Sequence, residues 1–141
     1  MKHFDVVHSL DAAQKIDLLY FFQNEWWSDT RTEEDLETIL NGSSFIVGML
    51  DPDDGRLVAF SRVLTDTFMF AYIYDVIVLR GYRRKGLGKL LIETTLAHPM
   101  IKNIKSVELI CIKELIPFYQ NFGFTTDYGF SVSMRRWVDP D

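Results

Sequence analysis

A cluster of basic residues and glycines between residues 80 and 89 is the part of this sequence best suited to chemistry. It contains five Lys or Arg residues and three glycines, between an apolar strand-like run at 72–79 and an apolar helix-like run at 87–97. The first amides of a helix lack carbonyl partners and lie at the positive end of the helix dipole. Glycine lets a ligand approach such amides closely. The loop therefore predicts a binding site for a polyanion such as a pyrophosphate.

Two well-known phosphate-binding loops do not fit this segment. Gly81 and Gly86 have the glycine spacing of a P-loop, but Leu87 and Gly88 occupy the positions of its Lys and its Ser or Thr. A dinucleotide-binding loop needs a third glycine where this chain has Leu91. Nucleotide hydrolysis and dinucleotide binding are therefore not expected.

Two motifs together resemble a known family. Residues 83–88 read R-x-x-G-x-G, and about thirty residues later residues 118–124 read F-Y-x-x-F-G-F. This pair resembles the GNAT family of acyl-CoA-dependent N-acetyltransferases, and the resemblance extends over about residues 6 to 136 in the order of elements as well. The pair of motifs at this spacing is more specific than the glycine motif alone.

The resemblance implies an α/β fold with a mixed, mostly antiparallel sheet of about six strands. Helices would cover both faces, and a central β-α-β unit would bind acyl-CoA, all in one domain, 1–141. The implied reaction is transfer of an acetyl group from acetyl-CoA to a primary amine of a small molecule or protein, by direct attack in a ternary complex. The alternative is an acyl-CoA-binding or sensor module without turnover. Homodimers are common among such proteins, so a second copy is a candidate partner.

The resemblance also assigns residues to the acetyl-CoA co-substrate. The pantetheine would pair with the backbone of the strand before the glycine loop, where that strand splays from the next one. The pyrophosphate would rest on the amides of the loop, and Arg83, Arg84 and Lys85 would supply positive charge. The full set assigned to acetyl-CoA is Val76, Ile77, Val78, Arg83, Arg84, Lys85, Gly86, Leu87, Gly88 and Lys89.

Tyr119 and Asp75 are the candidate catalytic residues. The tyrosine at this place in the F-Y motif implies a general acid for the departing thiolate, and a phenol keeps its proton at neutral pH. Asp75 is the candidate general base. Strand alternation, however, predicts that Asp75 and Ile77 face away from Tyr74, so a structural pairing of Asp75 with a cation such as Arg62 is the alternative. Glu108 is a further candidate base.

An aromatic loop and two strand tyrosines are the candidate acceptor site. Trp26, Trp27 and Arg31 lie between the first two predicted helices, and Tyr72 and Tyr74 share one face of the strand before the glycine loop. Paired tryptophans suit a flat or cationic group. They equally suit a hydrophobic lid or a dimer contact.

Composition limits the remaining possibilities. The net charge is −5, and residues 1–54 carry twelve acids against three bases, so the broad basic face of a nucleic-acid-binding protein is not expected. No apolar run is long enough to cross a membrane. One cysteine, Cys111, fits a reducing cytoplasm. Three scattered histidines offer no metal-binding spacing.

Periodicity and turn residues predict ten elements. The expected strands are 5–10, 44–50, 56–64, 68–79, 105–112 and 130–135. The expected helices are 12–24, 33–40, 87–97 and 114–121.

Overall fold

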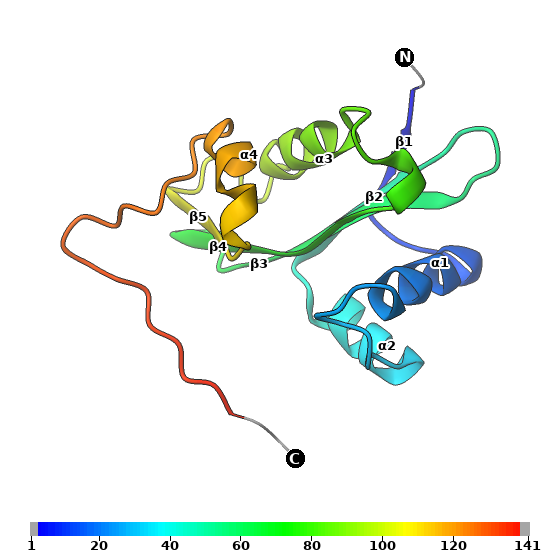
Figure 1. Ribbon diagram of the computed structural model, residues 1–141, viewed down its shortest axis with the longest axis horizontal. Coiled ribbons are helices and arrows are strands. Elements are labelled where there is room, and N and C mark those ends of the chain that lie inside the picture. Colours follow the sequence, from blue (N-terminus) through cyan, green and yellow to red (C-terminus); the bar gives the residue numbers. More distant parts are fainter. Residues whose placement is uncertain (1–2, 139–141) are drawn as a thin grey trace. The chain divides into compact units, whose positions relative to one another are not determined.

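The computed structural model describes residues 3–138, and Figure 1 shows their secondary structure. Two compact units make up the chain, Met1–Ile110 and Cys111–Asp141. The strands are β1 (Asp5–Val7), β2 (Phe45–Leu50), β3 (Leu57–Thr65), β4 (Phe70–Val78) and β5 (Ser106–Leu109). The helices are α1 (Ala12–Gln23), α2 (Glu33–Gly42), α3 (Leu87–Leu96) and α4 (Ile116–Gln120), with short 3-10 helices η1 (Arg80–Tyr82) and η2 (Lys113–Leu115).

A mixed sheet forms the centre of the first unit. Its strand order is β1-β2-β3-β4-β5, with antiparallel pairing except between β4 and β5, which are parallel. The connection between these parallel strands runs through α3, which lies on one face of the sheet, while α1 and α2 lie on the other (Figure 1). The prediction of a mixed, mostly antiparallel sheet with helices on both faces is confirmed. The observed five strands are close to the expected six.

The helices begin where the sequence predicts. The Gln14 amide donates to the Asp11 carboxylate at 2.8 Å, and the Asp35 amide donates to the Thr32 hydroxyl at 3.2 Å. In both cases the third residue of the helix bonds back to the cap, and an N-cap of this kind stabilises a helix by about 1 kcal/mol. None of the helices in residues 3–138 has the length and apolar character of a membrane span.

The main core lies between the sheet and α1. Leu18, Phe21 and Phe22 of α1 are buried, and Phe60 of β3 and Ile77 of β4 belong to the same cluster. The Phe22 ring packs edge-on against Phe60, with 6.2 Å between ring centroids. This packing sets the position of the C-terminal end of α1 relative to the end of β4, from which the glycine loop departs.

A buried polar contact fixes α3 on the opposite face of the sheet. The Thr95 hydroxyl donates to the Leu91 carbonyl at 2.7 Å and lies 2.8 Å from the hydroxyl of Ser61 on β3. Because both hydroxyls are buried and paired, separating α3 from the sheet would leave polar groups unsatisfied. This contact near the C-terminal end of α3 therefore fixes the helix on the sheet, and with it the position of the first turn of α3.

A bulge in β4 changes which side chains share a face. Phe60 pairs with Ile77, but Arg62 pairs with Tyr74, so two residues of β4 lie opposite one residue of β3. Asp75 is the first of these two residues of β4, and it has a φ of 55°. Since alternate residues of β3 share a face, Tyr74 and Ile77 lie on the same face of the sheet. The prediction that they face opposite ways is wrong, because simple alternation does not continue through a bulge.

The predicted strand at residues 130–135 does not form in the second unit. The alternation of apolar and polar residues there is typical of a strand with one buried face. A strand also needs a neighbour that supplies its hydrogen-bond ladder, and within the described part of the chain this segment has none. The short helix predicted at 114–121 is present as η2 followed by α4, with a proline in the first turn of α4.

Candidate functional site

The glycine loop leads into α3 as the sequence predicts. Gly86 is the N-cap of α3 with a φ of 78°, a left-handed conformation that favours glycine. No side chain in residues 3–138 caps this helix. Its first amides are therefore available to an external acceptor, and an anion is favoured there. Arg84, two residues earlier, also has a positive φ of 61°.

Tyr82 connects the glycine loop to a neighbouring turn by a hydrogen bond. The Tyr82 hydroxyl donates to Asp51 Oδ2 at 2.6 Å, which ties η1 to the turn between β2 and β3. The ammonium group of Lys85 lies 5.8 Å from the centroid of the Tyr82 ring. Lys89, one turn into α3, lies 3.8 Å from Glu93 on the same helix. The cations of the loop thus have different local environments.

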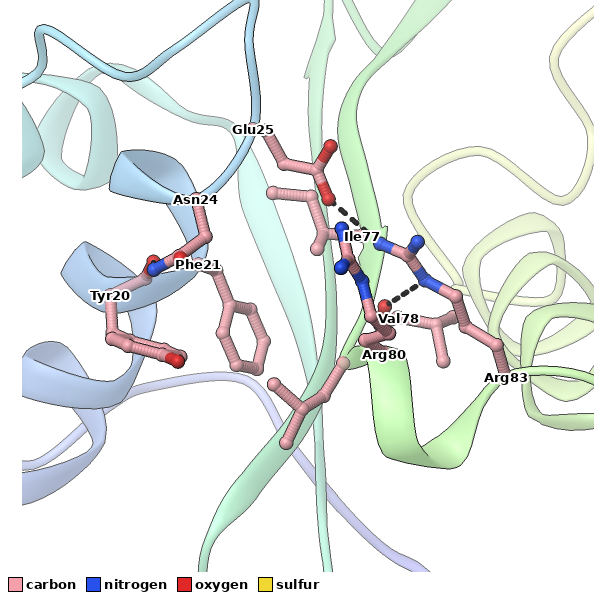
Figure 2. A pocket seen from close by; sticks show the side chains of 9 residues that line it. Tyr20, Phe21, Asn24, Glu25, Ile77, Val78, Arg80 and Arg83 are labelled. Atoms are coloured by element: carbon pink, nitrogen blue, oxygen red, sulfur yellow. Dashed lines mark hydrogen bonds and ion pairs between the residues drawn. The ribbon is translucent and has the colours of Figure 1, made fainter.

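Arg83 is engaged by the protein itself. Its Nε donates to the Val78 carbonyl at 2.8 Å, and one of its terminal nitrogens is 2.7 Å from Glu25, which follows the C-cap of α1 (Figure 2). All three residues line a pocket whose walls come from the C-terminal part of α1, the end of β4 and the start of the loop. The lining residues are Tyr20, Phe21, Asn24, Glu25, Ile77, Val78, Leu79, Arg80 and Arg83.

Among the described residues, the end of β4 beside this loop has no strand paired with it on the side of β5. The parallel ladder with β5 runs from Phe70 to Ile73 and stops there. The family resemblance assigns the pantetheine to this position, and that assignment stays a prediction. The Leu79 amide donates to the Val58 carbonyl of β3, so alternation turns the backbone groups of Val78 and Val76 away from β3.

The three valine and isoleucine positions assigned to the pantetheine are therefore not equivalent. Ile77 pairs with Phe60 of β3, and its side chain is buried in the core with α1. Val76 and Val78 alone present backbone donors and acceptors at the free edge. The Val78 carbonyl already accepts the hydrogen bond from Arg83.

Asp75 lies at the centre of an ion-pair network. Arg31 binds it with two hydrogen bonds, of 2.9 and 3.2 Å, and Arg62 Nε donates to it at 2.6 Å. The Asp75 side chain is 5% exposed. Two guanidinium groups occupy both of its oxygens, which favours the structural role over that of a general base. The expected pairing with Arg62 is present, and the network also ties the loop after α1 to the bulge.

We expect Asp75→Asn to lower the free energy of unfolding by about 1–3 kcal/mol, because three charge-assisted hydrogen bonds lose their ionised acceptor. Asparagine tolerates the positive φ at this position, so the backbone is retained. Urea denaturation measures the change, and Asn in place of the exposed Asp29 is the control. Unchanged stability together with lost turnover would instead assign Asp75 to the chemistry.

Most of the predicted acceptor residues gather around this network. The Arg31 guanidinium lies 4.4 Å from the ring centroid of Phe22 and 5.6 Å from that of Trp27. The Arg62 guanidinium lies 5.1 Å from the Tyr74 ring. Cations placed over aromatic rings in this way are held more firmly than by the ion pairs alone.

The other two predicted acceptor residues differ in their surroundings. Tyr72 stacks on Tyr74, with 6.0 Å between centroids, and pairs with Glu108 of β5 in the parallel ladder. Trp26 is 77% exposed. The structure thus brings Trp27, Arg31 and the two tyrosines to one face of the sheet and leaves Trp26 in solvent.

Tyr119 belongs to the second unit, where it lies on α4. Its ring packs edge-on against Phe118 and Phe124, at 5.0 and 5.9 Å between centroids. Burial, with a smaller contribution from Cys111, raises the pKa of Tyr119 to about 12. The phenol therefore keeps its proton throughout the neutral range. Its hydroxyl makes no hydrogen bond to residues 3–138, and it is not among the fully buried polar atoms.

Glu25 is the site residue that sequence reasoning missed. It is 58 positions away from Arg83, in the acidic first third of the chain, and it belongs to no motif. As one of twelve acidic residues in the first 54 positions, it carries no local signal. Only the packing of α1 against the sheet brings it to the loop.

The sequence is similar to known proteins over most of its length. The profile of the acetyltransferase (GNAT) family matches residues 10–124. The chain is 33% identical over 126 residues to an uncharacterized ycf52-like N-acetyltransferase of Prochlorococcus marinus, covering 88% of this chain and 68% of that protein. It is 32% identical over 85 residues to the chloroplastic GCN5-related N-acetyltransferase 3 of Arabidopsis thaliana, covering 60% of this chain. It spans about a third of the length of that plant relative, 36%.

The fold is also similar to solved structures. A candidate acetyltransferase of the GNAT family from Xanthomonas campestris pv. campestris superposes with a TM-score of 0.83 at 28% sequence identity. The match covers 98% of this chain and 95% of the Xanthomonas chain.

Proposed function

We propose that this protein, which belongs to the acetyltransferase (GNAT) family, transfers an acetyl group from acetyl-CoA to a primary amine. The observation that carries the proposal is the start of α3, where uncapped amides, a left-handed glycine and exposed cations meet beside the free edge of β4. An anion fits this site better than any other ligand because helix amides and cations act together there. Acetyl-CoA supplies both the anion and the acyl group.

The roles of the binding residues follow from this geometry. The amides from Arg84 to Lys89 would hold the pyrophosphate, with charge from the side chains of Arg84 and Lys85. The backbone groups of Val76 and the amide of Val78 would pair with the pantetheine, as an added strand does. A backbone amide at this edge would also polarise the thioester carbonyl.

The chemistry is a direct attack in a ternary complex. The amine nitrogen bonds to the acetyl carbon, the carbon–sulfur bond breaks, and the thiolate takes a proton. We assign that proton to Tyr119, from its place in the motif and from a pKa that keeps the phenol protonated. The proton lost by the amine would leave through water, since Asp75 is held by two arginines.

Thiol release from acetyl-CoA with a panel of primary amines tests the function. We expect CoA to form with at least one small-molecule or peptide amine, in proportion to acetylated product found by mass spectrometry. Tight acetyl-CoA binding without turnover for any amine would favour the second candidate, an acyl-CoA-binding module. The engagement of both Asp75 oxygens, which makes Asp75 unsuited to act as the base, is the observation that supports this candidate.

We expect Glu25→Gln to raise the affinity for acetyl-CoA by about 2- to 5-fold. Arg83 must leave Glu25 before it can serve the pyrophosphate, and a partly exposed ion pair of this kind contributes about 0.2–1 kcal/mol. Isothermal titration at low salt measures the difference. Glu37→Gln, which breaks the exposed pair with Lys15, is the matched control and should leave affinity unchanged. Weaker binding in Glu25→Gln would show that Glu25 orients Arg83 instead of competing for it.

A further inference from the structure

Two arginines on one face of the sheet keep hydrogen-bond donors that the protein itself leaves unused. Both belong to the first unit. Arg62 bonds to Asp75 through its Nε, and its two terminal nitrogens make no hydrogen bond to residues 3–138. Arg31 bonds to Asp75 through its terminal nitrogens and keeps its Nε. Since the described chain has no fully buried side-chain nitrogen without a partner, these donors are in contact with solvent.

The Arg62 guanidinium is held in one orientation. Its Nε lies 2.6 Å from Asp75 Oδ2, and its carbon Cζ lies 5.1 Å from the centroid of the Tyr74 ring. The two terminal nitrogens of such a group form a planar fork, which binds a carboxylate or a phosphate with two parallel hydrogen bonds. A fork that is oriented before the ligand arrives loses little conformational freedom on binding.

The charges on this face do not balance. Arg31 and Arg62 carry two positive charges, and Asp75 carries one negative charge. Glu108, a carboxylate of β5, pairs with Tyr72 on the other side of β4 from Arg62 and bonds to neither arginine in the described chain. The side chain of Arg62 is only 15% exposed, and a charge of low exposure is favourable when a counter-charge accompanies it. An anion is therefore the ligand that this face lacks.

The aromatic rings beside the network already hold cations of the protein. The Arg31 guanidinium lies 4.4 Å from the Phe22 ring and 5.6 Å from the Trp27 ring, and the Arg62 guanidinium lies over Tyr74. A ring that faces one cation attracts a second cation less, because the two positive charges repel each other. Trp27 is thus poorly suited to the cationic acceptor that the sequence suggested.

We propose that the acceptor is a small primary amine that also carries a carboxylate or a phosphate group, and that the terminal nitrogens of Arg62 bind this anion. The inference rests on the acetyl-transfer function proposed above and adds the class of acceptor. Asp75 directly precedes Val76, whose backbone is assigned to the pantetheine, so a short spacer joins an anion on Arg62 to an amine at the thioester. Arg62 then determines specificity, and Asp75 and Tyr74 position it.

Matched pairs of amines test the proposal on the unmodified protein. Each ω-amino acid from glycine to 6-aminohexanoate is compared with its carboxamide, and 2-aminoethyl phosphate is compared with ethanolamine, with rates expressed per neutral amine. We expect kcat/KM to be about 10- to 100-fold higher for the anionic member of at least one pair, and the preference to shrink as salt is added. The preferred pair shows whether the anion is a carboxylate or a phosphate. Equal kcat/KM within every pair would overturn the proposal.

Arg62→Lys separates the fork from its charge. Lysine keeps the positive charge but does not form two parallel hydrogen bonds. KM for the preferred anionic amine should rise about 10-fold with kcat nearly unchanged, because the anion is bound equally before and during the reaction. KM for the uncharged partner should stay the same, whereas a merely structural role of Arg62 would change both alike. Arg56→Lys, in the exposed turn before β3, is the matched control and should change neither. An unaltered ratio of the two KM values in Arg62→Lys would contradict the assignment.

A binding measurement distinguishes a failure of this inference from a failure of the proposed function. Both members of each pair are titrated into the protein saturated with CoA, where no acetyl group is available for transfer. If no amine is turned over but the anionic member still binds more tightly, the acetyl-transfer function fails and the anion site stands. If amines are turned over without preference for the anion, the function stands and this inference fails. Where no amine is turned over, equal or absent binding of the two members would overturn the anion site as well.

Discussion

Replacing Gly86 by glutamate should weaken acetyl-CoA binding by about 10- to 100-fold. The new carboxylate would stand at the N-cap of α3, where the proposal places the pyrophosphate, and would both repel it and compete for the same amides. Loss of one charge-assisted hydrogen bond costs about 1.5–3 kcal/mol, and each 1.4 kcal/mol is a factor of ten in affinity. Isothermal titration with acetyl-CoA measures the effect.

Two control variants separate charge from backbone strain. A side chain at Gly86 meets no atom within 4 Å, so Gly86→Ala tests the cost of the left-handed conformation alone and should lose far less affinity. Gly55 has a similar φ of 73° and equally open surroundings, but it lies in the turn between β2 and β3. Gly55→Glu should therefore carry the same strain and bind normally. Acetyl-CoA affinity that is unchanged in Gly86→Glu would contradict the placement of the pyrophosphate at α3.

Tyr119→Phe should lower kcat by about 10²–10⁴-fold, the usual cost of losing a general acid, while acetyl-CoA binds as before. The ring packing against Phe118 and Phe124 involves no hydroxyl, so phenylalanine keeps the fold of the second unit. Steady-state kinetics with the best amine from the panel and a separate binding measurement give the two quantities.

Two further measurements test the role of Tyr119: the pH dependence of kcat, and the kcat of a variant at a second tyrosine of the same unit. Because burial raises the pKa of Tyr119 to about 12, the phenol stays protonated and kcat should not fall on the alkaline side up to about pH 10. Tyr128→Phe, in the same unit, should leave kcat unchanged. Undiminished turnover in Tyr119→Phe would remove this residue from the mechanism and leave the thiolate to be protonated by water.

The bulge in β4 shows where sequence reasoning fails. Alternation along 72–79 is a sound rule for an unbroken strand, but the extra residue at Asp75 changes the face of every residue that follows relative to those before it. The ion pairs of Asp75 with Arg31 and Arg62 join residues 44 and 13 positions apart, so no local pattern announces them.

The sequence by itself determined the features that depend on neighbouring residues. The capping residues of α1 and α2, the turn at Gly86 and the free amides at the start of α3 follow from backbone preferences that act over a few positions. For this reason the uncapped start of α3 and the order of the elements as far as α4 were predictable.

Only the tertiary structure decided which residues become the contact partners of the charged side chains and of the backbone groups at strand edges. Packing of α1 against β3 and β4 brings Glu25 to Arg83, and the ladder between β4 and β5 ends before it reaches Val76 and Val78. The pattern of residues 130–135 specifies an apolar face, but a strand forms only when another strand supplies its hydrogen bonds. Partners distant in sequence are chosen by the packing of the whole molecule, because contact energies depend on position in space and not on position along the chain.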